Sequence, residues 1–391
     1  MNNKASSFQG VLFFSDVPWE GITQRPHHLA SGLASRWPVL WVEPLTLGHS
    51  RHLGVRTVGD NLHAVGVPLF PLNARQQYVQ RLARVLGDRA VARRGELFLQ
   101  ERMLRAAMRR CGLASTRYAL LIQNFQLIRL AGRLSPVKTL FDYIDDAFGF
   151  TEYPAWVAEE WRMAVRASDV VTVTSSVLQA QIVDQEPGRS GRVHRVPNGV
   201  EFSRFAGSSG ASRPADLPPD SRPIVGYVGS IYPWIDFELL EHLACQLPDA
   251  WLVLVGPAHP KVRESLSRLA RLPNVRVLGV RPYEEVPAYV RAFDVGIVPF
   301  RKTRLTAAVN PVKLYEYSAA GVPTVCTDFA TDLKEIGALI HTAHDRGEFT
   351  RSVRASMLER RDRRRVAELQ EFARRNDWEE RIARIASLLV D

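Results

Sequence analysis

The sequence predicts an α/β protein built from two Rossmann-like domains, each with a parallel sheet. Apolar runs of strand length alternate with helical patterns along most of the 391 residues. A stretch dense in Gly, Ser and Pro, GSSGASRPADLPPDSR, interrupts this alternation, which then starts again. A chain of this length can hold two domains of ordinary size. We therefore predict a first domain at 1–206, a linker at 207–222, a second domain at 223–375 and a C-terminal helix at 376–391.

Short apolar runs define the elements expected in the first domain. The predicted strands are Val11–Phe14, Val39–Val42, Tyr118–Ile122, Lys138–Ile144, Val170–Thr174 and Val193–Pro197, with helices at Pro26–Ser35 and Ala155–Ala167. In a doubly wound fold, the loop after the first strand lies over the ligand crevice. This loop has no G-x-G-x-x-G, so the dinucleotide-binding fingerprint is absent.

The second domain repeats the pattern. Its predicted strands are Ile224–Val228, Trp251–Val255, Val275–Leu278, Asp294–Phe300 and Val322–Thr327, with a helix at Lys261–Ala270. Another helix is expected to begin at Pro311, with Asn310 as its N-cap, and to end at Gly321. Apolar residues from Trp378 to Leu389 recur at helical spacing and predict a core-packing helix at the C-terminus.

The composition excludes several classes of protein. Hydrophobic residues make up 46% of the chain, and no run of 18 apolar residues or signal peptide is evident. We therefore expect a cytoplasmic protein. The three cysteines lie far apart and lack metal-ligand spacing, which argues against a disulfide framework or a zinc site.

The net charge of +10 suggests an anionic partner. Between Asn73 and Cys111 the sequence has ten arginines and only three acidic residues. The arginines are interleaved with apolar residues, as in helices that lie on an anionic membrane. A solvated helical face is the alternative. A second arginine cluster, at 351–375, is expected to be solvated. Nucleic acid is disfavoured, because stacking aromatics are not interleaved with the basic residues.

The predicted helix at Pro311 carries the strongest chemical signal. Its N-terminus offers free N–H groups and a partial positive charge, so an anion is expected near Asn310. Lys313 and Glu316 share one helical face, where the cation can reach a phosphate and the carboxylate can accept hydrogen bonds from ribose hydroxyls. The alternative is an ordinary exposed ion pair.

The segment NPVKLYEYSAAGVPTV, which contains both residues, resembles the donor-binding segment of GT-B glycosyltransferases, with the pattern P-x-K-x-x-E-Y-x-A-x-G-x-P-V-V. The resemblance implies that Glu316 holds the nucleotide ribose. Many relatives have a glutamate eight residues earlier that contacts the sugar, and this chain has Ala308 there. GT-B enzymes also commonly return their last helix to the first domain, which we expect of 376–391.

Two further segments match donor contacts of that family. Gly229 and Ser230 follow the first strand of the second domain, where a glycine lets the backbone approach a ligand. Relatives often have a cation shortly after this glycine, whereas this chain continues IYPWIDFELL. We therefore expect the donor phosphates to be bound by Lys313 or by the loop cations Arg301, Lys302 and Arg304. The nucleotide base is expected on GVRPY, with Gly279, Arg281 and Tyr283. Arg281 and Tyr283 could equally be plain surface residues.

The first domain supplies the other candidates. Its opening resembles a glycosyltransferase subgroup that reads W-x-x-x-x-Q-R-P-x-x-L-A and then V-E-P, which implies contacts to the acceptor and the donor phosphates. The candidates for these contacts are Trp19, Gln24, Arg25 and His27. Trp19 and His27 could instead pack under the loop.

Adjacent carboxylates follow a predicted strand in FDYIDDAFGF, and one of them, Asp145 or Asp146, could act as a general base. A helix cap and loop hydrogen bonds are the alternatives. With VTVTSSVLQAQI and VPNGVEFSRF downstream, the segment is similar to the glucuronosyltransferases of xanthan assembly, which implies that Asp145 is the base.

The predicted reaction is sugar transfer from a nucleotide diphosphate sugar, UDP favoured over GDP, to a hydroxyl of a glycan or lipid-linked acceptor. A hexosyl or glycuronosyl transfer without metal or cofactor is expected, because no D-x-D motif ends a strand. Inversion or retention stays open. The expected place is the cytoplasm, with association to the inner face of the membrane as an option. The alternatives are a nucleotide-sugar epimerase or phosphorylase of the same plan, or an inactive binding protein, which Ala308 and the absent cation after Gly229 keep open.

Overall fold

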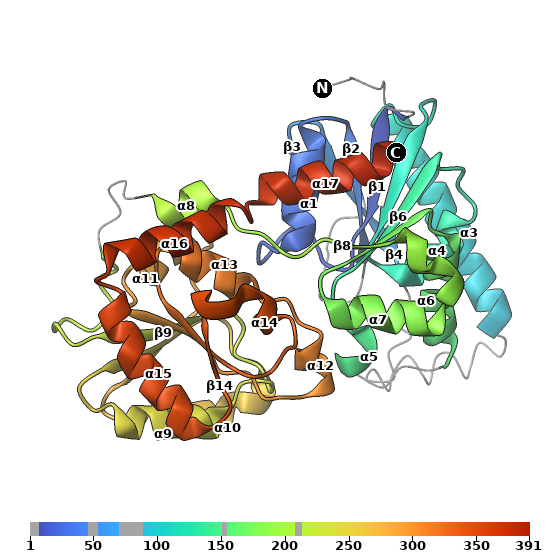
Figure 1. The fold of residues 1–391 in the computed structure, drawn as a ribbon. Coiled ribbons are helices and arrows are strands. Elements are labelled where there is room, and N and C mark those ends of the chain that lie inside the picture. The colour runs from blue at the N-terminus through green and yellow to red at the C-terminus, as the bar shows by residue number, and fades with distance from the viewer. Residues whose placement is uncertain (1–7, 46–53, 70–88, 151–154, 208–212) are drawn as a thin grey trace. The chain divides into compact units, whose positions relative to one another are not determined.

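The computed structural model describes residues 8–45, 54–69, 89–150, 155–207 and 213–391. The chain divides into two compact units. Unit 1 is Met1–Val196 together with Arg381–Asp391, and unit 2 is Pro197–Glu380. Both units have a mostly parallel sheet with helices packed against it (Figure 1), which confirms the predicted fold class.

The sheet of unit 1 has the strand order β3-β4-β2-β1-β5-β6-β7-β8. Its pairs are parallel except β3 with β4, which is antiparallel. The central strands are buried apolar runs, as expected for a sheet covered on both faces. The strand bounds are β1 Gly10–Phe14, β2 Val39–Leu45, β3 Arg56–Gly59, β4 Leu62–Pro68, β5 Tyr118–Ile122, β6 Lys138–Tyr143, β7 Val170–Val173 and β8 Val193–Arg195.

Helices surround this sheet, including the end of the chain. They are α1 Arg25–Ala34, α3 Arg89–Arg110, α4 Ile128–Ala131, α5 Ala147–Phe150, α6 Ala155–Ala167 and α7 Ser176–Gln185. Helix α17 (Trp378–Val390) continues from unit 2 into unit 1. A Cβ atom on Gly32 of α1 would lie 2.2 Å from Cδ1 of Ile382, so a glycine at this position allows α1 and α17 to pack closely.

The sheet of unit 2 has the order β11-β10-β9-β12-β13-β14, with parallel pairs throughout the described strands. The strand bounds are β9 Ile224–Val228, β10 Trp251–Val255, β11 Val275–Gly279, β12 Val295–Val298, β13 Thr324–Thr327 and β14 His341–Ala343. The helices are α8 Phe202–Ala206, α9 Phe237–Gln246, α10 Arg263–Leu269, α11 Val286–Arg291, α12 Arg304–Ala307, α13 Val312–Ala319, α14 Leu333–Ile336, α15 Arg346–Glu359 and α16 Arg363–Arg374.

The boundary between the units differs from the predicted one at residue 206. Residues 197–206 group with unit 2, because Val200 pairs with Asp377 and α8 packs against α11, α13 and α16. Of the predicted linker, 208–212 lie outside the described residues. Leu217, in the remainder, belongs to the hydrophobic core of unit 2.

The basic stretch that begins at Asn73 is described only from residue 89, where α3 begins, so 73–88 lie outside the described residues. Leu104 and Met108 of α3 are buried, whereas Phe98 and Leu99 are exposed. Within the described part of the chain, no helix has the length and apolar character needed to span a membrane.

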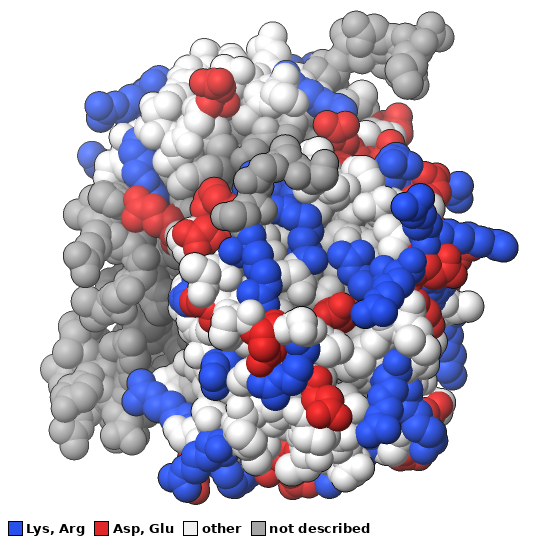
Figure 2. All heavy atoms as spheres, turned by 90° about the vertical axis from the view of Figure 1, so that its left-hand side faces the viewer, with Lys and Arg blue, Asp and Glu red and all other residues white. Residues whose placement is uncertain are grey.

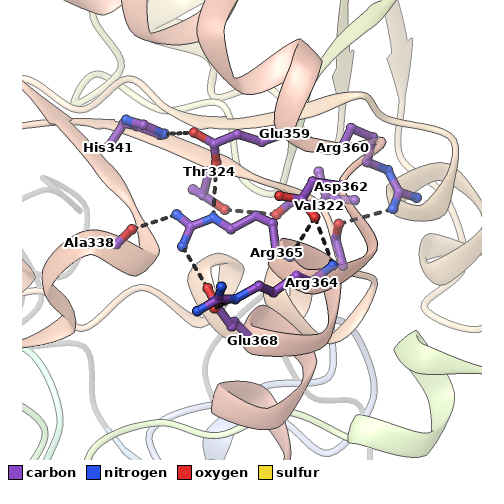
Figure 3. Close-up of polar contacts among 11 residues, drawn as sticks. Val322, Thr324, Ala338, His341, Glu359, Arg360, Asp362, Arg364, Arg365 and Glu368 are labelled. Atoms are coloured by element: carbon purple, nitrogen blue, oxygen red, sulfur yellow. Dashed lines mark hydrogen bonds and ion pairs between the residues drawn. The ribbon is translucent and has the colours of Figure 1, made fainter.

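The arginine cluster at 351–375 contains structural residues as well as solvated ones (Figure 3). Arg360 Nη1 donates to the carbonyl of Gly321 at 3.0 Å, and Arg365 Nε donates to Glu359 at 3.0 Å. Exposed arginines such as Arg364 fit the predicted solvated face. On the face shown in Figure 2, Asp and Glu are interspersed among Lys and Arg. Within the cluster, Glu371 pairs with both Arg374 and Arg375, so its surface is not purely basic.

Candidate active site

The candidate donor site lies where the chain changes direction across the sheet of unit 2. Strand β9 is flanked by β10 on one side and β12 on the other. In open α/β sheets, ligands bind beyond the carboxyl ends of the strands at such a switch point. Gly229 directly follows β9, and the chain beyond β12 leads into α12 and α13.

Lys313, in the first turn of α13, lies directly over Gly229. A Cβ atom on Gly229 would be 2.4 Å from Cε and 2.6 Å from Nζ of Lys313, and Gly229 has φ +130°. The ammonium is 5.3 Å from the centre of the Tyr227 ring and 5.9 Å from that of Phe300. Burial lowers the pKa of Lys313. Among the described residues, no carboxylate forms an ion pair with this ammonium, so it can receive an anion.

Glu316, one turn further along α13, is only 9% exposed. Burial raises its pKa to about 7; Lys313 opposes this shift and Glu201 adds to it. The described residues provide no hydrogen-bond donor to this carboxylate. Lys313 and Glu316 are therefore not the exposed ion pair that was the alternative interpretation of their spacing. Glu316 is buried and Lys313 is half-buried, at the edge of the sheet where ligands of open α/β folds bind.

Asn310 does not cap this helix, contrary to the prediction. The helix begins at Val312, its N-cap residue is Pro311, and no side chain caps it. Asn310 Oδ1 accepts the backbone N–H of Asn198 at 2.9 Å, and Asn310 Nδ2 donates to the hydroxyl of Tyr315 at 3.1 Å. These tertiary partners use the side chain that would otherwise cap the helix, so the first turn of α13 keeps N–H groups for a ligand.

The predicted loop after β12 contains the short helix α12. Thr303 caps it, and the side chain and backbone of Thr306 complete a capping box. Arg301 and Arg304 are exposed, and exposed Lys302 lies 3.1 Å from Asp328. Ala308, at the position where many relatives have a glutamate, is buried and offers no polar group.

The segment predicted to hold the base is partly occupied by contacts within unit 2. Arg281 pairs with Asp216 and donates to the hydroxyl of Tyr289 at 2.9 Å. Half-buried Tyr283 has the guanidinium of Arg204 5.0 Å from its ring centre. Gly279 has φ +72°.

Ser230, next to Gly229, accepts the Tyr227 hydroxyl on its carbonyl at 2.8 Å. Its backbone therefore holds the turn beneath Lys313.

In unit 1, Arg25 is 3% exposed and forms a bidentate pair with Asp142. Its Nε donates to Oδ2 at 2.9 Å, and its Nη2 donates to Oδ1 at 2.8 Å. Asp142 also accepts from Gln123 at 2.8 Å and Thr172 at 2.7 Å. This buried network ties α1 to strands β6 and β7 and to the loop after β5, at the carboxyl edge of the sheet.

The other candidates of the first loop pack beneath it. His27 Nδ1 accepts the backbone N–H of Gln24 at 3.2 Å, while Nε2 donates to the carbonyls of Pro18 and Trp19 at 3.2 and 3.1 Å. Burial lowers the pKa of His27, which fits the neutral ring. The Trp19 ring lies 5.3 Å from that of His27. Trp19 and His27 thus pack under the loop, and Gln24 is the exposed N-cap of α1.

The two adjacent aspartates after β6 differ in environment. Asp146 is buried and accepts the backbone N–H of Phe148 at 3.2 Å, as a capping residue does. Asp145 is half-buried, and loss of water around it raises its pKa to about 7, with Asp16 adding repulsion. The pKa of Asp16 is raised to about 6 by the surrounding protein and by Asp142, although the residue keeps an exposed surface.

Sequence reasoning missed Asp16. The available signal was its position directly after β1, at the same edge of the sheet as Asp145 after β6.

Part of unit 2 is similar to a known family. A family model described as Glycosyl transferases group 1 matches residues 222–357, which include Lys313 and Glu316. The match to a group 1 glycosyltransferase domain is thus confined to this part of the chain. Over 170 residues the chain is also 33% identical to TuaH of Bacillus subtilis (strain 168), named as a proposed teichuronic acid biosynthesis glycosyltransferase. That match covers 44% of this chain and 43% of TuaH, less than half of either protein.

Solved structures extend the likeness of fold beyond the group 1 domain. Sucrose-phosphate synthase from Thermosynechococcus elongatus has a TM-score of 0.71 at 17% identity, over 97% of this chain and 98% of that one. The E. coli trehalose-6-phosphate structure bound with UDP-2-fluoro glucose has a TM-score of 0.71 at 15% identity, over 98% and 99%. The chain therefore has the GT-B fold in which the group 1 domain is the second half.

Proposed function

We propose that this protein is a glycosyltransferase that moves a sugar from a nucleotide diphosphate sugar, UDP favoured, to an acceptor hydroxyl. The observation that carries the proposal is the pair on α13. Glu316 is buried and Lys313 is half-buried, and neither has an ion-pair partner among the described residues, at the switch point of the segment that the group 1 model matches. Buried charged groups without partners are costly, and a bound nucleotide would compensate both of them.

The donor contacts follow from the chemistry of these groups. Lys313 and the N-terminus of α13 would bind the diphosphate and stabilise the charge of the leaving group, so no metal is required. Glu316 would accept hydrogen bonds from the ribose hydroxyls. We assign the base to the segment from Gly279 to Tyr283. Further phosphate contacts would come from exposed loop cations, Arg301, Lys302 and Arg304.

Asp145 is the proposed general base. It would take the proton of the acceptor hydroxyl as that oxygen bonds to the anomeric carbon, while the bond from this carbon to the diphosphate breaks and the nucleoside diphosphate leaves. A carboxyl pKa of about 7 suits a base that works near neutral pH. Asp146 is the neighbouring carboxylate, and Trp19, Gln24, Arg25 and His27 would shape the loop over the acceptor.

The proposed acceptor is a glycan or lipid-linked intermediate of cell-surface glycan synthesis, and the transferred sugar is of hexosyl or glycuronosyl type. The likeness to TuaH supports this class.

We also propose that the protein works in the cytoplasm, at the inner face of the membrane. The basic helix α3, with exposed Phe98 and Leu99, supports membrane contact. Failure of the purified protein to bind anionic vesicles at low salt would remove this part of the proposal.

A thermal-shift panel tests the donor site directly. UDP, GDP, ADP, CDP and their sugars would be added, with and without magnesium, to wild type, Glu316→Ala and Glu264→Ala. Glu264 is an exposed residue of α10 and serves as the matched control. We expect one nucleotide to stabilise the wild type and the control, but not Glu316→Ala. A folded wild type that responds to no nucleotide would refute the proposal, and donor turnover to an isomeric nucleotide sugar without acceptor would favour an epimerase instead.

A further inference from the structure

We infer that the carboxyl edge of the unit 1 sheet binds a neutral, hydroxyl-rich group, such as a sugar ring without phosphate or carboxylate. The residues that carry this inference are Gln123, Asp16 and Asp145, on the loops after β5, β1 and β6. If the protein is a glycosyltransferase, this group belongs to the acceptor, and that identification alone rests on the proposed function. The binding preference itself is a property of unit 1.

Gln123 presents a buried acceptor that lacks a donor. The residue is 6% exposed, and its backbone N–H donates to the carbonyl of Phe14 at 2.8 Å, beside the end of β1. Its Nε2 donates to Asp142 Oδ2 at 2.8 Å, which fixes the amide, because an amide oxygen cannot face a carboxylate at that distance. Among the described residues, nothing donates to Oε1. A ligand hydroxyl would satisfy it.

The three side chains belong to one edge of the sheet. Strand β5 lies between β1 and β6, and Phe14, Ile122 and Phe141 are in register across the three strands. Asp16 and Gln123 therefore follow neighbouring strand ends. Gln123 and Arg25 both donate to Asp142, and Asp145 interacts electrostatically with Asp16 and Arg25, so these groups lie around one region.

The charges in that region oppose an anion. Among the described residues, four carboxylates, those of Asp16, Asp142, Asp145 and Asp146, share one guanidinium, that of Arg25, which Asp142 already binds in a bidentate pair. Arg25 is the one cation among the described residues whose charge acts on Asp145.

The neighbouring ring of His27 adds no positive charge, because Nδ1 accepts and Nε2 donates in the neutral tautomer.

This arrangement can recognise hydroxyls but not phosphates. The amide oxygen and ionised carboxylates accept hydrogen bonds, and a sugar hydroxyl can donate to each of them. A phosphate or uronate offers acceptors and negative charge to the same groups, and like charges without compensation repel. The net positive charge of the whole chain, +10, is therefore not a guide to the ligand of this edge.

The test compares sugars that differ only at carbon 6, which carries a hydroxyl, a carboxylate or a phosphate. The full chain is used, at pH 8 and low salt. Glucose, glucuronate and glucose 6-phosphate form one set, and the galactose and mannose sets repeat it. Affinities are measured by titration with NMR detection, in the presence of the nucleotide that gives the largest thermal shift. We expect a neutral sugar to bind at least about tenfold more tightly than its uronate and its phosphate, and the difference to shrink in 0.5 M salt.

Variants assign the effect to these residues. Asp16→Asn should reduce the discrimination several-fold, because it removes one repelling charge from an exposed position. Asp184→Asn, which removes an exposed carboxylate from α7 of the same unit, should leave it unchanged. Gln123→Met should lower the affinity for neutral sugars and leave the thermal shift caused by the nucleotide unchanged.

Three results would overturn the inference: anions that bind as tightly as neutral sugars, equal behaviour of the two aspartate variants, or no binding by any sugar while a nucleotide still binds. Loss of the nucleotide response with sugar selectivity retained would refute the proposed donor site alone.

Discussion

Donor affinity should rise about tenfold between pH 6 and pH 8, and Glu316 should set this dependence. Burial holds the pKa of this carboxyl at about 7, with a contribution from Glu201. The ionised form offers one acceptor oxygen to each ribose hydroxyl, whereas protonation turns one of these oxygens into a donor. About one molecule in eleven is ionised at pH 6 and about ten in eleven at pH 8, which corresponds to a change of about 1.4 kcal/mol in binding free energy.

The assay is isothermal titration with UDP-glucose, or with the sugar nucleotide that the panel selects. A sugar nucleotide is preferable to UDP, because the terminal phosphate of UDP gains a proton near pH 6 and would add its own pH dependence. The unphosphorylated nucleoside is the second probe. It makes no phosphate contact with Lys313, whose pKa burial also lowers.

Matched variants decide the cause. Glu316→Gln keeps the shape of the side chain and removes its titration, so its affinity should be low and flat across this range. Glu264→Gln should keep the wild-type slope. A wild-type affinity that changes less than twofold from pH 6 to pH 8, or a slope that persists in Glu316→Gln, would refute the assignment of ribose binding to an ionised Glu316.

Four further substitutions test the roles of single residues. Lys313→Met should lower the affinity for the sugar nucleotide at least about tenfold in titration calorimetry, because it removes a charge-assisted contact to phosphate. The affinity for the nucleoside should stay unchanged, and an equal loss of affinity for both ligands would contradict this role. Gly229→Ala should cost about 1–3 kcal/mol in chemical denaturation, because φ is +130° and the added Cβ would lie 2.4 Å from Cε of Lys313; wild-type stability would show that the turn adapts. Asp145→Asn should reduce sugar transfer about 10²–10⁴-fold and leave donor affinity unchanged, and near-normal transfer would exclude it as the base. Arg25→Met should destabilise the fold by about 3–5 kcal/mol, because it leaves the buried carboxylate of Asp142 without its ion-pair partner; adding Asp142→Leu should restore part of the loss in the same denaturation assay.

The sheets could be predicted where a strand is a continuous apolar run. The predicted bounds of Tyr118–Ile122, Ile224–Val228 and Trp251–Val255 agree with β5, β9 and β10, because parallel strands buried on both faces need no polar alternation. The antiparallel strand β3, Arg56–Gly59, was missed. Its burial alternates along a short, mostly polar segment, and it joins β4 through a turn with Asn61 at φ 55°. Its position is set by pairing rather than by its own hydrophobicity.

In the candidate site, local chemistry could be predicted better than tertiary partners. Lys313 and Glu316 lie within one helical turn, so their spacing was enough to place them on one face. The partners of other residues lie far away along the chain. Asn310 bonds to Asn198, 112 residues earlier, and Arg25 to Asp142, 117 residues later. Nothing local in the sequence distinguishes a helix cap or a phosphate ligand from a residue with such distant partners.

The close approach of Lys313 to Gly229 explains why a glycine stands at the end of β9. The ammonium would lie 2.6 Å from a Cβ atom at position 229, so it occupies the space beside the turn that a side chain there would fill. The rings of Tyr227 and Phe300 face this ammonium and favour its charged form, against the effect of burial on its pKa. One cation from α13 thus stands at the end of β9. The glycine is required for this placement, because any other residue would displace the lysine.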